Sequence, residues 1–277
     1  MQSEIKIHPE HGRVYWMTDG KTEVAVAMDF GIRIVHLSCL GLENLYYEQP
    51  ADLSDGFGTP DTWKLRGGHR MWMSPESWDS YHPDDTPITY RALDNGVILE
   101  QDTDPILGVK KFLQITFENG AVRLEHRFQN MTASPITAAS WGINTLAAGG
   151  KAWMPFPPTE AGDFVPKRVI SLWGQTSMAD PRMHWSADSL TVQHQSIDGY
   201  FKAGFYCSEG FATFENKGQK LTIRYGVPDI HKLPDLGCNF EIFMCPEFME
   251  LETLGVTDTM QPGESVTHWE TWELEKL

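Results

Sequence analysis

The chain has 277 residues and a mass of 31.4 kDa, with 41% hydrophobic and 22% charged residues. This composition can bury a large core, which excludes a disordered or collagen-like chain. Lys and Arg number 22 against 38 Asp and Glu, a net charge of −16. A field of that sign repels nucleic-acid phosphates and anionic lipids. We therefore expect neither nucleic acid nor a membrane as a partner, whereas neutral solutes such as sugars are not repelled.

The N-terminus has no basic segment followed by an apolar one, so no signal peptide is predicted. No run of ~18 apolar residues occurs, so no transmembrane helix is predicted either. The four cysteines form no Cys-x-x-Cys pair, and four in a chain of this length do not indicate a disulfide framework. We expect a reduced, cytoplasmic protein.

Glycine-containing turn signals separate short segments of β-branched or alternating residues. They are Asp19-Gly20, Asn95-Gly96, Asn119-Gly120 and Lys217-Gly218. Asn-Gly and Asp-Gly adopt positive φ at low cost, which two-residue type I′ hairpins require. The strongest hairpin pattern covers residues 110–128, where the side chains alternate with a period of two on both sides of the turn.

Helical signals are weak throughout the chain. No window of ~12 residues combines an apolar stripe of helical spacing with caps, and short helical turns are expected only within 52–63 or 75–80. We therefore predict one all-β domain over residues 1–277, with two stacked antiparallel sheets and few short helices. Long irregular segments at 48–66, 79–87 and 155–166 are the kind of loop in which binding and catalysis concentrate.

Several common catalytic signatures are absent from the sequence. It contains no G-x-S-x-G, Walker A, complete G-x-G-x-x-G or H-E-x-x-H motif. This counts against a common serine hydrolase, a P-loop enzyme, a Rossmann oxidoreductase and a zincin. The polar cluster at 82–85 has no further ligands at metal-site spacing, so we predict a solvated loop there and no metal site.

The densest run of ionisable and aromatic residues lies at 66–78. After two glycines, it brings together an acid–base candidate, a fixed cation, a stacking ring and a carboxylate: His69, Arg70, Trp72 and Glu76. Such crowding without amphipathic periodicity is typical of a functional site. The alternative is a turn that leads into a strand, with a structural ion pair between Arg70 and Glu76.

Tryptophan is abundant, at 10 residues. Its rings stack on the apolar faces of sugars, and its N–H donates to hydroxyl groups. Candidates for stacking, beside Gly- and Pro-rich loops, are Trp72, Trp141 and Trp153. We expect packing roles for Trp63, Trp173, Trp269 and Trp272, since tryptophan is highly buried on average.

The last third of the chain carries two carboxylates at strand spacing. Glu250 and Glu252 lie two residues apart and so share one strand face. Like charges on one face raise at least one pKa, which burial raises further, and this suits a general base. The alternative is an edge strand with solvated glutamates. Lys202 interrupts an apolar strand, and either reaches solvent or points into a polar pocket.

Together these motifs resemble the DUF4380 group of galactose mutarotase-like proteins. The resemblance extends from about residue 31 to residue 274, through segments 67–76, 81–85, 201–204, 239–243, 249–255, 261–265 and 269–274. It implies an antiparallel β-supersandwich with a carbohydrate site on its concave face.

The resemblance also implies catalytic roles. The wider aldose 1-epimerase family uses a glutamate as general base and a histidine as general acid, with an arginine in the pocket. Glu252 matches the family's glutamate on a late strand before a Pro-Gly-Glu turn, with Glu250 as the second choice. Arg70 matches the arginine, and Trp141 stands where the family has a histidine.

We therefore predict an isomerase that interconverts sugar anomers without a cofactor. Glu252 would take the proton of the anomeric hydroxyl while His69 protonates the ring oxygen, and Trp72 or Trp141 would stack on the sugar. Hydroxyls or an acidic substituent would be held by Arg70, Glu76, Lys202 and Glu241. The histidine and these four residues should meet Glu252 at one concavity.

Two other functions fit the same sequence. A non-catalytic sugar-binding or regulatory domain would keep the Trp and Arg residues without needing an acid. A glycoside-cleaving hydrolase or lyase would need two carboxylates ~5–9.5 Å apart across the site. The fold alone does not choose among the three.

Overall fold

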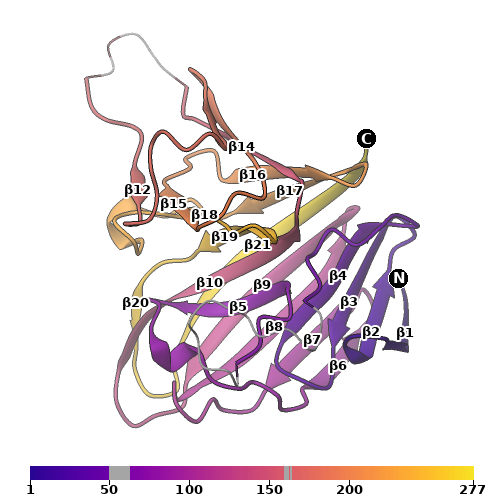
Figure 1. The fold of residues 1–277 in the computed structure, drawn as a ribbon. Helices are drawn as coiled ribbons and strands as arrows, with labels where there is room; N and C mark the ends of the chain where they lie inside the picture. Colours follow the sequence, from indigo (N-terminus) through magenta and orange to yellow (C-terminus); the bar gives the residue numbers. More distant parts are fainter. Residues whose placement is uncertain (50–62, 159–161, 163) are drawn as a thin grey trace.

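The computed structural model describes residues 1–49, 63–158, 162 and 164–277. The regular secondary structure of the described chain is almost entirely β-strand, in two antiparallel sheets (Figure 1). Of one predicted helical segment, 52–63, the structure describes only Trp63. The other contains the 3₁₀ turn η1 (Trp78–Ser80), and a second turn is η2 (Ile230–Lys232). Neither turn is long or apolar enough to span a membrane, and the described residues contain no other helix.

The first sheet has 11 strands in the described chain. In order across the sheet they are β1 (Gln2–His8), β2 (Gly12–Thr18), β3 (Thr22–Ala27), β4 (Arg33–Cys39), β5 (Gly68–Ser74), β10 (Ile136–Ala147), β19 (Phe248–Leu254), β18 (Phe240–Met244), β15 (Phe201–Phe205) and β12 (Ile170–Leu172), with β20 (Asp258–Met260) paired to β10. At the centre of this sheet, β10 therefore joins the early strands β1–β5 to the late strands β19 and β18.

The second sheet has 10 strands in the same described residues. In order they are β13 (Met183–Trp185), β14 (Ser189–Gln193), β11 (Lys151–Pro155), β16 (Phe211–Asn216), β17 (Gln219–Tyr225), β21 (Ser265–Lys276), β9 (Ala121–Asn130), β8 (Val109–Glu118), β7 (Gly96–Gln101) and β6 (Thr89–Leu93). Both sheets contribute to one large apolar core, for example through Phe128 and Phe214 from this sheet and Phe201 and Phe240 from the other.

The four turn signals all join antiparallel strand pairs, β2–β3, β6–β7, β8–β9 and β16–β17. Asn119 and Gly120 have φ of 53° and 79°, as a type I′ turn requires. Gly96 differs, because its φ is not positive. A Cβ there would lie 1.9 Å from the carbonyl oxygen of Ile115, so this glycine allows the close approach of β8 instead.

Candidate functional site

The candidate site lies on the outer face of the first sheet, where β5, β10, β19, β18 and β15 run side by side. Arg70 pairs with Ile143, Ile143 with Glu252, and Glu252 with Glu241. Residues that lie opposite each other on paired strands project to the same face of a sheet, so these four side chains lie on one face. Their immediate neighbours in sequence project the other way, between the sheets.

A cavity of about 430 Å³ opens on this face, a size usual for small-molecule sites. Its ionisable lining residues are Arg70, Glu76, Lys202, Glu250 and Glu252. Its indole and phenol rings are those of Trp63, Trp78, Tyr81, Trp141, Trp173 and Tyr200. Flat rings beside charged groups form a surface suited to a ring-shaped ligand with polar substituents.

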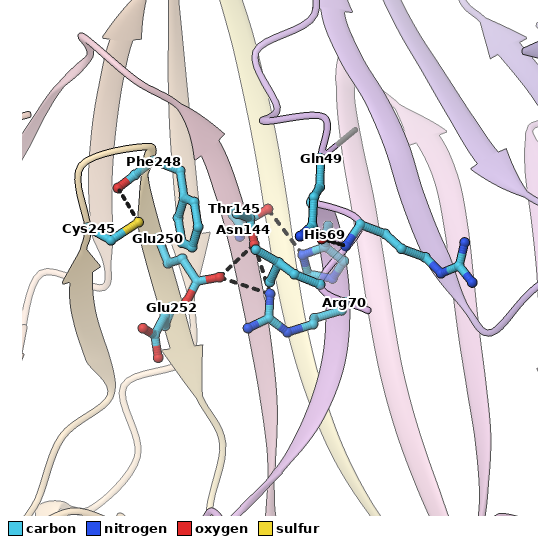
Figure 2. Close-up of polar contacts among 12 residues, drawn as sticks. Gln49, His69, Arg70, Asn144, Thr145, Cys245, Phe248, Glu250 and Glu252 are labelled. Carbon is cyan, nitrogen blue, oxygen red and sulfur yellow. Dashed lines mark hydrogen bonds and ion pairs between the residues drawn. The ribbon is translucent and has the colours of Figure 1, made fainter. Parts of the chain in front are cut away.

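Arg70 is fixed in the cavity by two partners. Its Nη1 lies 2.9 Å from Oε1 of Glu250 and 2.8 Å from Oγ1 of Thr145, and that hydroxyl lies 2.7 Å from the same carboxylate oxygen (Figure 2). Burial lowers the pKa of Arg70, but Glu250 outweighs burial and the pKa is raised. The guanidinium therefore stays charged, with its face 5.4 Å from the Trp72 ring centre.

Lys202 points into the site, not into solvent. Its Nζ lies 3.0 Å from Oε2 of both Glu241 and Glu252, and the residue is 7% exposed. The ammonium also lies 4.5 Å from the Trp141 ring centre and 5.0 Å from that of Trp173. Burial lowers the pKa of Lys202, whereas Glu252 and Glu241 raise it by more. Lys202 is thus a permanent cation shared by two carboxylates.

Glu252 combines a fixed position with an unused oxygen. Burial raises its pKa to about 7, although Lys202 lowers it and Glu250 raises it further. Burial likewise raises the pKa of Glu241 to about 8. Oε2 of Glu252 binds Lys202, but within the described chain Oε1 has no hydrogen-bond partner. The carboxylate is therefore oriented on one side and available on the other.

Other buried donors at the site are also unpaired within the described residues. They are Nε1 of Trp72, Nε1 of Trp141 and Nε of Arg70. Leaving a buried polar group without a partner costs ~1–3 kcal/mol each, so such groups usually meet a ligand or water. Their concentration around one cavity indicates a binding site.

Three of the residues predicted to contact the sugar have surroundings that differ from the prediction. Glu76 lines the cavity but accepts a hydrogen bond from the Tyr81 hydroxyl, so Arg70 pairs with Glu250 and not with Glu76. Trp72 is buried at the side of the site, 5.9 Å from the Trp63 ring. Glu241 reaches the site only through Lys202.

His69 requires a correction. Strand alternation in β5 turns it away from Arg70 and into the space between the sheets, where it is fully buried. Its Nδ1 lies 3.1 Å from Oδ1 of Asn144, and its Nε2 lies 2.8 Å from Nε2 of His126. His69 does not line the cavity, so it cannot meet Glu252 there or protonate the ring oxygen of a sugar.

The partners of His69 form a second buried polar group, which we call the inter-sheet cluster: His69, His126, Asn144, Thr253, His268 and Glu270. Glu270 accepts hydrogen bonds from Thr253 at 2.6 Å, Trp272 at 2.5 Å and Asn144 at 3.3 Å. Burial raises the pKa of Glu270 and lowers that of His126 to about 4. These groups are enclosed between β5, β10 and β19 on one side and β9 and β21 on the other.

Three residues of the inter-sheet cluster have the chemistry of metal ligands. One ligand atom from each of His69, His126 and Glu270 lies within 4.8 Å of the others. Both ring nitrogens of His69 and both carboxylate oxygens of Glu270 already have hydrogen-bond partners in the protein. A metal ion would have to replace those bonds. The sequence shows no ligand spacing because the three residues come from three distant strands.

Sequence reasoning missed part of the cavity. Trp63 and Trp173, predicted to be packing residues, line it, whereas Trp153 lies on β11 and packs near Phe211. Thr145 carried no signal by itself. It lies four residues after Trp141 and therefore on the same strand face, which was its one available indication.

A scan against protein-family models found no match, and a search of curated proteins found none. Solved structures do match. A galactose mutarotase-like protein from Lactobacillus casei ATCC 334 is 11% identical, with a TM-score of 0.60 over 95% of this chain and 100% of that chain. A candidate aldose 1-epimerase from Escherichia coli K12 is 13% identical, with a TM-score of 0.58 over 95% and 99%. A galactose mutarotase-like protein from Clostridium acetobutylicum is 9% identical, with a TM-score of 0.58 over 100% and 99%.

At these identities the matches show the fold. The chain has a galactose mutarotase-like fold, which the resemblance predicted, and its two antiparallel sheets are those that the hairpin signals predicted. The narrower DUF4380 grouping stays a prediction.

Proposed function

We propose that this protein is a carbohydrate isomerase of the aldose 1-epimerase type, with Glu252 as its general base. The observation that carries the proposal is the Glu252 carboxylate, which is buried, anchored by Lys202 through Oε2 and unpaired at Oε1. Its pKa of about 7 lies where a base for a hydroxyl proton works best near neutral pH. The named functions of the fold neighbours are in keeping with this chemistry.

In the proposed reaction, Oε1 of Glu252 takes the proton of the anomeric hydroxyl. The bond between the anomeric carbon and the ring oxygen breaks, and its electron pair goes to that oxygen, which gains a proton. The aldehyde rotates, the hydroxyl formed from the ring oxygen attacks its other face and returns its proton to solvent, and Glu252 returns its proton to the former carbonyl oxygen. The fixed cations Arg70 and Lys202 stabilise the charge that develops on oxygen. The described cavity lining contains no histidine, so solvent at the mouth supplies the ring-oxygen proton.

The remaining site residues bind and orient the sugar. Trp141 and Trp173 already flank Lys202, and their rings offer a stacking surface beside the reacting group. The unpaired Nε1 group of Trp141, which lines the cavity, donates to a hydroxyl. Glu76 and Tyr81 hold each other at the cavity, where the Glu76 side chain is exposed. Because all four cysteines are free, we place this reaction in the reducing cytoplasm.

The test is anomer exchange of D-hexoses, followed by exchange NMR with the wild-type protein and Glu252→Gln. We expect the wild type to accelerate exchange and the substitution to slow it by ~10²–10⁴-fold while binding is kept. The control is Glu273→Gln, the same chemical change at an exposed ion pair with Arg224. An unchanged rate in Glu252→Gln would remove Glu252 from the mechanism.

A non-catalytic sugar-binding domain is the second candidate. It is favoured by one observation, the absence of a histidine from the described cavity lining. Such a domain would bind sugars in the same cavity without any acceleration of anomer exchange by the wild type. The NMR experiment above therefore separates the two candidates before any variant is made.

A further inference from the structure

The cavity contains more carboxylates than cations. Glu76, Glu250 and Glu252 line it, and Glu241 lies directly behind, in contact with Lys202. Against these four carboxylates, the described lining offers two cations, Arg70 and Lys202. With every group ionised, the balance is two positive against four negative charges; the raised pKa values of Glu252 (about 7) and Glu241 (about 8) reduce this excess near neutral pH. The site therefore lies in a negative local field, within a chain that is itself acidic.

Both cations are already engaged by carboxylates. Nη1 of Arg70 lies 2.9 Å from Glu250, and Nζ of Lys202 lies 3.0 Å from each of two carboxylates. A ligand with a carboxylate or phosphate would have to compete for these cations with carboxylates that are covalently held in place. An acidic sugar substituent therefore fits this arrangement poorly.

Beside the unpaired donors of Trp72, Trp141 and Arg70, the site has an unpaired acceptor. Oε1 of Glu252 has no hydrogen-bond partner among the described residues, and the residue is 1% exposed. A buried, unpaired carboxylate oxygen is costly, and a charged donor satisfies it best, because hydrogen bonds to ionised groups are about twice as strong as neutral ones.

The aromatic lining favours the same sign of charge. The negative faces of aromatic rings attract cations. In this site they already do so, since the ammonium of Lys202 lies over Trp141 and Trp173, and the guanidinium of Arg70 lies over Trp72. An ammonium group on a ligand would gain from the rings, whereas an anion would not.

We propose that the cavity selects an amino sugar, a hydroxylated ring with a protonated amine, over the neutral sugar of the same configuration, and rejects the acidic one. The amine would donate to one lone pair of Oε1 of Glu252, which leaves the other for the anomeric hydroxyl, and it would face the aromatic rings. This specificity rests on the proposed function for the location of the ligand. It identifies the class of carbohydrate that the site takes.

The experiment measures binding by calorimetry for a panel of nine sugars: the hexosamine, hexose and hexuronate of the gluco, galacto and manno configurations. In at least one configuration, the wild type should bind the hexosamine about ten-fold or more tightly than the hexose. It should bind the hexuronate more weakly than either. The preference should decrease as salt increases, because part of it is electrostatic.

Glu252→Gln keeps the shape of the side chain but removes its charge. It should reduce the hexosamine-to-hexose ratio toward one, whereas Glu273→Gln, at the exposed pair with Arg224, should leave the ratio unchanged. Equal affinity for hexosamine and hexose, tightest binding of a hexuronate, or no binding of any of the nine sugars would each overturn the inference.

Exchange NMR on the same samples separates this inference from the proposed function. If the hexosamine binds preferentially but no sugar exchanges its anomers faster, the isomerase proposal fails and the amino-sugar specificity stands. If anomer exchange accelerates with no preference for the amine, the specificity fails and the isomerase proposal stands.

Discussion

Two buried polar clusters lie back to back on the same three strands, and only one of them has the features of a binding site. On β5 the two clusters use the consecutive residues His69 and Arg70, and on β10 they use Asn144 and Thr145. Strand alternation sends the first of each pair between the sheets and the second to the cavity. Burial and shifted pKa values are common to both clusters.

The clusters differ in whether their polar atoms all have hydrogen-bond partners within the protein. Between the sheets, both oxygens of Glu270 and both ring nitrogens of His69 have partners within the protein. At the cavity, Oε1 of Glu252 and Nε1 of Trp141 have none among the described residues. A closed network of this kind specifies how the sheets pack. The open network, which borders the cavity, is the one that a ligand can complete.

The largest expected effect is a loss of stability when an acceptor is removed from the inter-sheet cluster. Glu270→Ala removes the acceptor of three donors, on Thr253, Trp272 and Asn144. We expect a loss of ~3–5 kcal/mol in the free energy of unfolding, measured by urea denaturation. Glu273→Ala on the same strand, where the glutamate is exposed and paired with Arg224, should change it by less than ~1 kcal/mol. Similar losses for the two variants would contradict a structural role for the inter-sheet cluster.

Because of the two clusters, the free energy of unfolding should pass through a maximum as the pH is raised. Burial lowers the pKa of His69, His126 and His268, so below their ordinary value of 6.5 the unfolded chain binds more protons, and stability rises with pH up to 6.5. Burial raises the pKa of Glu252 to about 7 and of Glu241 to about 8 from 4.5, so there the folded chain binds more protons. That contribution falls as pH rises from 4.5 to about 8.

Above pH 6.5 only the carboxylate contribution still changes, and stability should fall by roughly 2 kcal/mol toward pH 8. Urea unfolding at a series of pH values measures the curve. Glu252→Gln should flatten the falling limb and leave the rising limb intact. A continuous rise in the stability of the wild type up to pH 8 would show that Glu252 and Glu241 are not protonated in the folded protein near neutrality.

The next largest expected effect is a loss of stability when a side chain is added where the inter-sheet cluster packs closely against β10. Gly142 lies on β10 between two cavity residues, and a Cβ there would be 2.4 Å from Oε1 of Glu270 and 3.3 Å from Cε1 of His69. We expect Gly142→Ala to lower the free energy of unfolding by ~1–3 kcal/mol. Gly174→Ala is the matched control, because nothing lies within 4 Å of its added Cβ. An equal effect of both would argue against tight packing at Gly142.

The sequence predicted the hairpins well. It predicted less well which side chains of a strand face the cavity and which face the other sheet. Hairpins such as β8–β9 were predictable because turn residues and period-two patterns act over a few positions. The side of β5 that faces the cavity depends on its pairing with β10, about 70 residues away, and no local signal fixes it. His69 was therefore assigned to the wrong face, although Arg70, one residue later, lines the cavity.

The site residues on strands were easier to predict from the sequence than those in irregular segments. Glu250 and Glu252 were found because two carboxylates at strand spacing are unusual, and Lys202 because it interrupts an apolar strand. Trp63 and Trp173 come from irregular segments outside the strands. No period predicts where such a ring ends up, and average burial favoured the core. Loop-borne parts of a site are thus the hardest to obtain from sequence.

The smallest expected effect gives the sharpest comparison, because one substitution can be made in both clusters. Thr253→Val removes a hydroxyl that donates to Glu270 and lies 2.7 Å from Nε2 of His268. Thr145→Val removes one that donates to Glu250 at 2.7 Å and accepts from Arg70 at 2.8 Å. Valine keeps the shape, so the lost hydrogen bonds dominate each change.

Between the sheets, Thr253 is fully buried, and its partners are left unpaired by the substitution. We expect a loss of ~1–3 kcal/mol in the free energy of unfolding and unchanged affinity for the tightest-binding sugar. At the cavity, Arg70 and Glu250 still hold each other and solvent can enter. Thr145→Val should therefore lose only ~0.5–1.5 kcal/mol, but weaken sugar binding by about two- to ten-fold, because Arg70 is less firmly oriented. If Thr253→Val instead weakened binding while Thr145→Val affected stability alone, the assignment of structural and ligand-binding roles to the two faces would have to be reversed.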